Sequence, residues 1–131
     1  MSWILACDDH AHITRLIELT LRKRGWNVVA CADGLSALGE LARRPNPELI
    51  ITDFQMPRLD GLGLIREVLE QPALRGVPVI LLTAKAFELS EQRLQSQLGI
   101  ACMLKKPFSP RQLLALVEQL TQPAELMASA Q

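Results

Sequence analysis

Five short apolar segments, separated by stretches with helical periodicity, constrain the fold of this 131-residue chain more than any other feature. Most of their side chains are Val, Ile, Leu or Ala, and they cover residues 3–7, 27–31, 49–52, 77–82 and 100–104. Such near-continuous apolar strands are typical of a parallel sheet that is buried on both faces. Five strand–helix units in series therefore predict a three-layer α/β domain, with a five-stranded parallel sheet between two layers of helices.

The boundaries of the five expected helices rest on capping and stop signals. Asp60 is a good N-cap for the third helix, so Asp60 and Gly61 are interpreted as helix-start residues rather than site residues. A polar helix is expected at 86–98, before the stop signal Gly99. Pro78 lies near the beginning of the fourth strand, where proline is tolerated. Residues 1–121 are assigned to one domain, and the tail 122–131 receives no role.

The balance of charge and the short length of the apolar stretches argue against several classes of function. The 14 basic residues balance the 14 acidic ones, which argues against bulk attraction to nucleic acid or to a membrane surface. No stretch reaches the roughly 18–20 apolar residues that span a bilayer. The first residues lack the basic region of a signal peptide. The chain is therefore expected to act in the cytoplasm, without membrane insertion and without direct contact to nucleic acid.

The three cysteines are Cys7, Cys31 and Cys102, all in apolar, strand-like segments. An odd count without CxxC spacing indicates reduced intracellular thiols rather than a disulfide framework. Cysteine in such surroundings is usually a small buried hydrophobic residue. We therefore expect all three to be buried and structural.

Charged and hydroxyl side chains follow four of the five expected strands. Asp8 and Asp9 follow the first strand, Asp53 the third, Thr83 the fourth and Lys106 the fifth. Ligands of an open parallel sheet bind beyond the carboxyl ends of its strands, so these side chains are expected to share one cleft. Three neighbouring carboxylates repel one another, and a cation offsets that repulsion. Hard oxygen ligands of this kind suit Mg²⁺.

Each of these residues has an ordinary explanation when it is taken alone. An Asp pair after a strand is usually a turn or a helix cap. A threonine at a strand end commonly reflects β-propensity, and a lysine is commonly solvated. Their joint occurrence at four strand ends is what indicates a functional site.

These motifs resemble the signature of receiver domains of two-component systems, of the chemotaxis-regulator type. The resemblance extends over about residues 3–121 and rests on Asp8-Asp9, the segment 51–61, Thr83-Ala84 and Lys106-Pro107-Phe108. The family implies a flavodoxin-like fold. It also implies phosphotransfer from a sensor histidine kinase or a histidine phosphotransfer protein, with Mg²⁺ as cofactor.

The resemblance gives each matching position a role. Asp53 is the expected phosphoacceptor, whose carboxylate attacks phosphohistidine and becomes an acyl phosphate. Asp9, Asp53 and the backbone carbonyl of Gln55 are the expected Mg²⁺ ligands, and Asp8 is expected to act mostly through metal-bound water. The metal offsets charge on the phosphoryl oxygens.

The remaining matches concern the lysine and the threonine. Lys106 is expected to pair with a phosphoryl oxygen and is preferred to Lys105, because the family's lysine directly precedes the proline. The bond before Pro107 is a candidate cis peptide, as X-Pro bonds are the common place for one. Thr83 is expected to hydrogen-bond the phosphoryl group and to carry the signal outward.

Three positions depart from the family pattern or modulate it. Met103 stands where the family usually has Tyr or Phe, which puts the usual output switch in question. Gln55 and Lys85 stand two residues after Asp53 and Thr83, and these positions are expected to tune the lifetime of the phosphate. No effector module follows residue 121, so output is expected through protein contact or an absent effector domain, with the target unknown.

His10 and His12 follow the acidic pair and are expected on a helix surface rather than at a metal, because positions i and i+2 do not share a helix face. Other classes of function remain alternatives. A haloacid-dehalogenase-like phosphatase would need a D-x-D pattern after the first strand, whereas this chain has adjacent aspartates. A pseudo-receiver that serves only for protein interaction would lack an acidic residue or the lysine. A flavodoxin would need a hydroxyl-rich phosphate loop.

Overall fold

The computed structural model describes residues 2–84 and 90–121. All five strands are parallel and form one sheet in the order β2-β1-β3-β4-β5. The elements are β1 (Trp3–Cys7), α1 (Ala11–Arg22), β2 (Asn27–Cys31), α2 (Gly34–Arg43), β3 (Leu49–Asp53), α3 (Gly61–Leu69), the 3-10 helix η1 (Pro72–Leu74), β4 (Val79–Thr83), α4 (Glu91–Leu98), β5 (Cys102–Lys105) and α5 (Pro110–Thr121).

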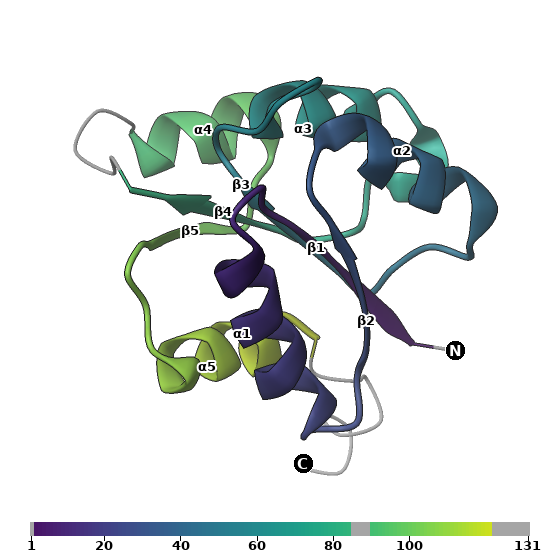
Figure 1. The fold of residues 1–131 in the computed structure, drawn as a ribbon. Helices are drawn as coiled ribbons and strands as arrows, with labels where there is room; N and C mark the ends of the chain where they lie inside the picture. The colour runs from purple at the N-terminus through teal and green to yellow at the C-terminus, as the bar shows by residue number, and fades with distance from the viewer. Residues whose placement is uncertain (1, 85–89, 122–131) are drawn as a thin grey trace, which may run out of the picture.

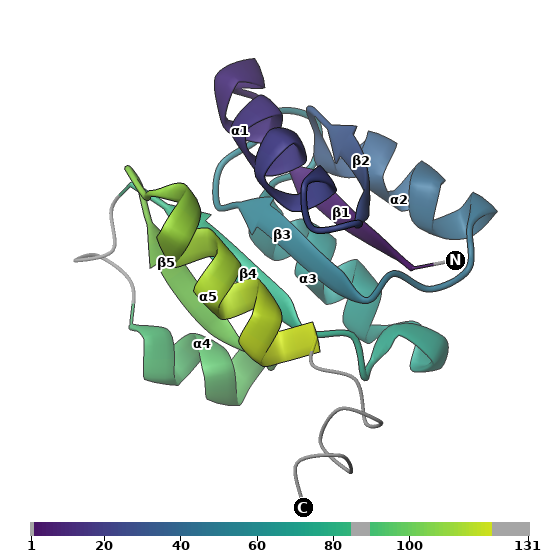
Figure 2. The same ribbon diagram turned by 90° about the horizontal axis from the view of Figure 1, so that it is seen from below.

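Helices cover both faces of the sheet (Figures 1 and 2): α1 and α5 lie on one face, and α2, α3 and α4 lie on the other. Alternation along each strand directs side chains to the two layers in turn. In β1, Leu5 and Cys7 join the core under α2, α3 and α4, whereas Ile4 and Ala6 join the core under α1 and α5. The expected three-layer fold is confirmed.

Local signals in the sequence set several helix boundaries. The side chains of Asp33, Asp60 and Ser90 each accept a hydrogen bond from a backbone N–H in the first turn of α2, α3 and α4, respectively. Gly99 ends α4 in the left-handed region, with a φ of 68°. The expected role of Asp60 as an N-cap is therefore confirmed, at 2.8 Å from the amide nitrogen of Gly63.

Other boundaries differ from those expected. β4 begins at Val79, because residues 77–78 precede the ladder and Pro78 contributes only its carbonyl, to the amide of Ile50. β5 begins at Cys102 rather than at residue 100, and η1 was not expected. Of the polar helix expected at 86–98, the structure has α4 from Glu91 with Ser90 as its N-cap; residues 86–89, like the tail 122–131, lie outside the described residues.

Burial of the cysteines follows the expectation in two of three cases. Cys7 and Cys31 are buried, whereas Cys102 on β5 is partly exposed. All three thiols are free. Within residues 2–84 and 90–121, none of the helices combines the length and apolar character needed to cross a bilayer.

Candidate functional site at the carboxyl ends of the strands

The polar residues predicted from the strand ends do meet at one edge of the sheet. Asp53 and Thr83 are the last residues of β3 and β4, Asp8 directly follows β1, and Lys106 directly follows β5. Asp53, Thr83 and Lys106 border a cavity of about 200 Å³. Its lining consists of Asp9, His10, Asp53, Phe54, Gln55, Thr83, Ala84 and Lys106. Parallel pairing brings these positions together, because every strand of the sheet ends at this edge.

One ammonium group bridges two carboxylates at the centre of the site. Lys106 Nζ lies 2.6 Å from Asp8 Oδ2 and 3.1 Å from Asp53 Oδ1. The side chains are 15%, 0% and 8% exposed, respectively, so all three charges are largely withdrawn from water. Buried charges persist when they are paired. Lys106 therefore offsets part of the repulsion between Asp8 and Asp53.

The pKa values of Asp53 and Lys106 reflect the imbalance of charge at this site. Burial raises the pKa of Asp53, and the charge of Asp8 raises it further, against the opposing effect of Lys106. Burial alone would lower the pKa of Lys106, but its hydrogen bonds with Asp8 and Asp53 reverse that and raise it. One cation between two buried carboxylates leaves a negative excess that a second cation would neutralise.

His10 borders this site at an exposed position just before α1. His10 is the N-cap residue of α1 with extended backbone, so the rule of helix faces does not apply to it. Its Nδ1 lies 3.1 Å from Asp8 Oδ1 and 3.4 Å from Asp9 Oδ1, and its amide donates to Asp8 Oδ1. His12 is exposed on α1, as expected, with its ring 5.8 Å from that of His10.

The donor atoms around the cavity are close enough to share one metal ion. One ligand atom from each of Asp8, Asp9, His10 and Asp53 lies within 4.8 Å of the others. Carboxylate oxygens are the ligands preferred by Mg²⁺, and an imidazole nitrogen is a common additional ligand for divalent metals. Three carboxylates against one ammonium group also supply the negative charge that a divalent cation needs. The residues present therefore fit a divalent metal.

The loop after β3 is held closely against the site. The amide of Gly61 donates to Phe54 O, and a Cβ at position 61 would come within 2.0 Å of Asp53 O. Only glycine fits this approach, so Gly61 shapes the site as well as beginning α3. Arg58 adopts a φ of 69°, and Gln55 is exposed at the cavity. Sequence spacing alone did not reveal this second role of Gly61.

Thr83 and the region around Lys106 are linked through the backbone. Thr83 is buried, and its carbonyl accepts a hydrogen bond from the amide of Lys106. The Lys106-Pro107 peptide bond is cis, as the sequence allowed. Lys105 is exposed, which agrees with its expected solvation. Lys85 lies outside the described residues.

Met103 sits on β5 between the core and α4. Its half-buried side chain packs against the core under α2, α3 and α4. Its amide donates to the carboxylate of Glu91, the first residue of α4, at 2.8 Å. Met103 therefore contacts the core and α4 without lining the cavity at Asp53.

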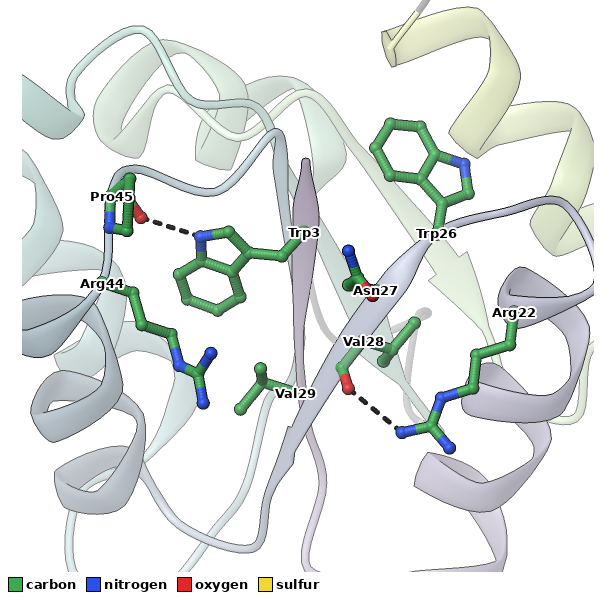
Figure 3. A pocket seen from close by; sticks show the side chains of 8 residues that line it. All are labelled: Trp3, Arg22, Trp26, Asn27, Val28, Val29, Arg44 and Pro45. Carbon is green, nitrogen blue, oxygen red and sulfur yellow. Dashed lines mark hydrogen bonds between the residues drawn. The ribbon is translucent and has the colours of Figure 1, made fainter. Parts of the chain in front are cut away.

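A larger cavity, of about 630 Å³, lies at the amino ends of β1 and β2 (Figure 3). Trp3 Nε1 donates to Pro45 O at 2.7 Å, and the guanidinium of Arg44 lies 5.5 Å from the centre of the Trp3 ring. Arg22 pairs with Glu18 at 2.9 Å, and Arg44 pairs with Glu40 at 2.8 Å. The cations of this cavity already have acidic partners, unlike the carboxylates at the other end of the sheet.

Comparison with known proteins assigns the family. The sequence model of the response regulator receiver domain family matches residues 4–118 of this chain. The chain belongs to this family. A receiver domain is a regulatory phosphoacceptor domain rather than a classical enzyme, and receiver domains work with histidine kinases.

Curated relatives of this receiver domain are transcriptional regulators. It is 38% identical over 114 residues to the probable transcriptional regulator ycf27 of Porphyridium aerugineum, covering 87% of this chain and 45% of that protein. It is 34% identical over 125 residues to the alkaline phosphatase synthesis transcriptional regulatory protein PhoP of Bacillus subtilis, covering 95% of this chain and 50% of PhoP. The chain thus spans about half the length of these relatives.

One solved structure of a similar receiver domain contains a metal ion. The receiver domain of the sensor histidine kinase PA1611 from Pseudomonas aeruginosa is 31% identical, with a TM-score of 0.81 over 93% of this chain and 98% of that one. That protein coordinates a magnesium ion in its active-site cleft.

Proposed function

We propose that this receiver domain is a switch that accepts a phosphoryl group on Asp53 from a sensor histidine kinase or a histidine phosphotransfer protein. The observation that carries the proposal is the buried trio of Asp8, Asp53 and Lys106 at the strand ends. Asp53 is the carboxylate that both borders the cavity and pairs with the lysine.

Transfer of a phosphoryl group to Asp53 forms one bond and breaks another. A carboxylate oxygen of Asp53 attacks the phosphorus of phosphohistidine, an O–P bond forms, and the P–N bond breaks. The imidazole nitrogen leaves with the electron pair of that bond. Lys106 Nζ, 3.1 Å from Asp53 Oδ1, is positioned to pair with a phosphoryl oxygen, and Thr83 is positioned to hydrogen-bond another. The domain itself supplies these groups, so phosphotransfer and later hydrolysis are self-catalysed.

Asp8, Asp9, Asp53 and the backbone carbonyl of Gln55 are the proposed holders of Mg²⁺. His10 is added to this set because its Nδ1 lies against both members of the acidic pair. When bound, the ion would offset negative charge that gathers as the phosphoryl group approaches. The magnesium-bound cleft of the PA1611 receiver domain supports this assignment.

Three further residues are proposed to modulate the switch. Gln55 at the cavity and Lys85 are long side chains able to obstruct an attacking water, so they set the phosphate's lifetime. Met103 replaces the usual aromatic ring with an unbranched side chain that fills space by small adjustments. It is therefore proposed to couple Thr83 less sharply to the outer face formed by α4, β5 and α5.

The relatives support a proposal for the output of the domain. Because the curated relatives are transcriptional regulators about twice as long as this chain, a DNA-binding effector in a longer protein is one proposed output. Contact between this domain and a separate protein is the other. In either case, the domain itself is proposed to act in the cytoplasm without touching nucleic acid.

Labelling by a small phosphodonor tests the proposal. Wild type and Asp53→Asn are incubated with Mg²⁺ and acetyl phosphate, and the intact mass is measured for the added phosphoryl group. Asp60→Asn is the matched control, because asparagine caps a helix as well as aspartate does. We expect phosphorylation of wild type and of Asp60→Asn, and none of Asp53→Asn.

Retained labelling in Asp53→Asn would contradict the assignment of the phosphoacceptor. Turnover of a small phosphate monoester would instead favour the phosphatase alternative. A domain that binds its partner but takes no phosphate under any condition would favour the pseudo-receiver.

A further inference from the structure

Two cysteines stand side by side where β1 and β2 end. Cys7 and Cys31 are direct partners in the parallel register of these strands. Both belong to the core under α2, α3 and α4, so their side chains are on the same face of the sheet. Neighbouring strands lie about 4.8 Å apart, which is within the roughly 4.4–6.8 Å that Cα atoms of a disulfide span. Both thiols are free.

Access to the two sulfurs differs. Cys7 is 0% exposed, whereas Cys31 is 7% exposed and lines a cavity of about 410 Å³ between β2 and α2. Small residues, including Ser36 and Gly39, form much of the cavity wall. A Cβ added at Gly39 would meet nothing within 4 Å, so the space in front of it is open. A small reagent therefore reaches Cys31 before Cys7.

We propose that Cys31 and Cys7 form a reversible redox pair, oxidised to a disulfide by hydrogen peroxide or another small peroxide. The Cys31 thiolate attacks one peroxide oxygen, so that an S–O bond forms, the O–O bond breaks, and hydroxide leaves to become water. The Cys7 sulfur then attacks the Cys31 sulfur, the S–O bond breaks, and the departing hydroxide takes the Cys7 proton as a second water. Both sulfurs are oxidised, and the peroxide is reduced.

The bond would act directly on the end of β1. Asp8 follows Cys7, and its amide donates to Cys31 O at 3.0 Å. The Cβ atoms of a disulfide lie about 3.8 Å apart, closer than facing Cβ atoms of neighbouring strands ordinarily lie, so closing the bond draws the ends of β1 and β2 together. The buried carboxylate of Asp8 must move with them. We therefore expect oxidation to weaken divalent-metal binding, a consequence that rests on the proposed function, whereas formation of the disulfide does not.

Strain also makes the pair reversible. Because the bond would hold its Cβ atoms closer than paired strands ordinarily do, it would store some strain, and strained disulfides are more easily reduced. Cys102 offers a comparison within the same chain, because it is more exposed but its partner in the register is Ile80. Exposure alone would favour oxidation of Cys102, whereas the proposed pairing favours Cys31 and Cys7.

Peroxide treatment followed by peptide mapping tests the pair. The full chain is oxidised with hydrogen peroxide, quenched with catalase, alkylated under denaturing conditions, and digested for mass spectrometry. We expect a cross-link between the peptides of Cys7 and Cys31 that dithiothreitol removes, with Cys102 left free to alkylate. Cys102→Ser should form the same cross-link, and Cys31→Ser should form none.

Gly39→Leu keeps both thiols but fills the open side of the cavity, so we expect it to slow cross-linking without preventing it. A wild type that oxidises at Cys31 to sulfinic acid without a cross-link would overturn the proposal. So would a cross-link that involves Cys102, or an unchanged rate in Gly39→Leu.

Magnesium affinity, measured by calorimetry on the reduced and oxidised forms, separates the pair from the proposed function. Weaker binding after oxidation supports the coupling, and equal affinity overturns it. Absence of Mg²⁺ binding in both forms would contradict the proposed function, whereas the cross-link would still establish the pair.

Discussion

The two ends of the sheet differ in how their charges are balanced, and the difference is more informative than the size of the cavities. At the amino end, a cavity of about 630 Å³ is lined by Trp3 and by arginines that already pair with glutamates of their own helices. At the carboxyl end, a cavity of about 200 Å³ holds Lys106 between two buried carboxylates. The smaller cavity therefore retains the uncompensated charge that a ligand can satisfy.

The fold produces this asymmetry because the parallel strands all end at one edge. Each strand contributes its last polar residue to a common place, whereas the amino ends receive the apolar beginnings of the strands and the ends of the helices. We infer that function in this domain follows electrostatic imbalance, and that the larger cavity is structural.

Removal of the bridging ammonium group should have the largest effect. Lys106→Ala leaves Asp8 and Asp53 buried without their common partner, and we expect a loss of about 3 kcal/mol in the free energy of unfolding without metal. Labelling by acetyl phosphate should fall as well. Lys105→Ala is the matched control at an exposed position, with an expected change below about 0.5 kcal/mol. Equal effects of the two variants in urea unfolding would contradict the account.

Removal of one buried carboxylate should act in the opposite direction. Because the pKa of Asp53 is raised in the folded state, its ionisation opposes folding at neutral pH. Asp53→Asn should therefore raise the free energy of unfolding without metal, by about 0.5–2 kcal/mol at pH 7. Added Mg²⁺ should stabilise wild type more than the variant, by mass action.

The sign of this effect can be checked by pH. A raised folded pKa means that the native state holds the Asp53 proton more tightly than the unfolded chain does. That contribution is fully present below the unfolded pKa of about 3.9 and is lost as pH rises through the folded pKa. The advantage of Asp53→Asn should therefore shrink as pH falls toward about 4. Thermal melts over this range that show a growing advantage would contradict the assignment.

A substitution at the cavity between the amino ends of β1 and β2 should change stability and leave phosphorylation of Asp53 unchanged. Arg44→Gln removes the contact with the Trp3 ring and the pairing with Glu40, and we expect a loss of about 0.5–1 kcal/mol from the cation–π contact. The rate of labelling at Asp53 should stay as in wild type. A change in that rate as large as the one caused by Lys106→Ala would break the distinction between the two ends.

The smallest expected change in stability concerns the rim of the site. Gln55→Ala, alone and combined with Lys85→Ala, should speed loss of the phosphoryl group from Asp53. Stability should change by less than about 0.5 kcal/mol for the exposed Gln55. The decay is followed by intact mass after removal of the phosphodonor. An unchanged lifetime in the double variant would show that these side chains do not restrain the attacking water.

Sequence periodicity predicted the sheet and its helices because buried parallel strands are apolar along their whole length. The same prediction placed Asp8, Asp53, Thr83 and Lys106 at one edge of the sheet, because parallel strands all end at the same edge. The beginning of β4 was placed too early, because Val77 and Pro78 continue the apolar run without joining the ladder.

The details of the site depend on the three-dimensional arrangement of the side chains. The pairing of Lys106 with Asp8 as well as with Asp53 depends on side-chain reach past the two strands, β3 and β4, that separate β5 from β1, which spacing along the chain does not encode. The contact of His10 with Asp8 and Asp9 was not expected, because His10 precedes α1, whereas the argument from helix faces placed it on the helix. The close approach of Gly61 to Asp53 O likewise depends on the path of the loop after β3.

A single titration compares the two ends of the molecule directly. ¹⁵N NMR spectra of the metal-free domain are recorded as Mg²⁺ is added, and backbone amides at Asp9, Asp53 and Lys106 are followed together with the indole N–H signals of Trp3 and Trp26. We expect saturable shifts at the three site residues and unchanged indole signals. Indole shifts as large as those at Asp53, or no shift at Asp53 at all, would contradict the claim that ligand binding belongs to the charged end of the sheet.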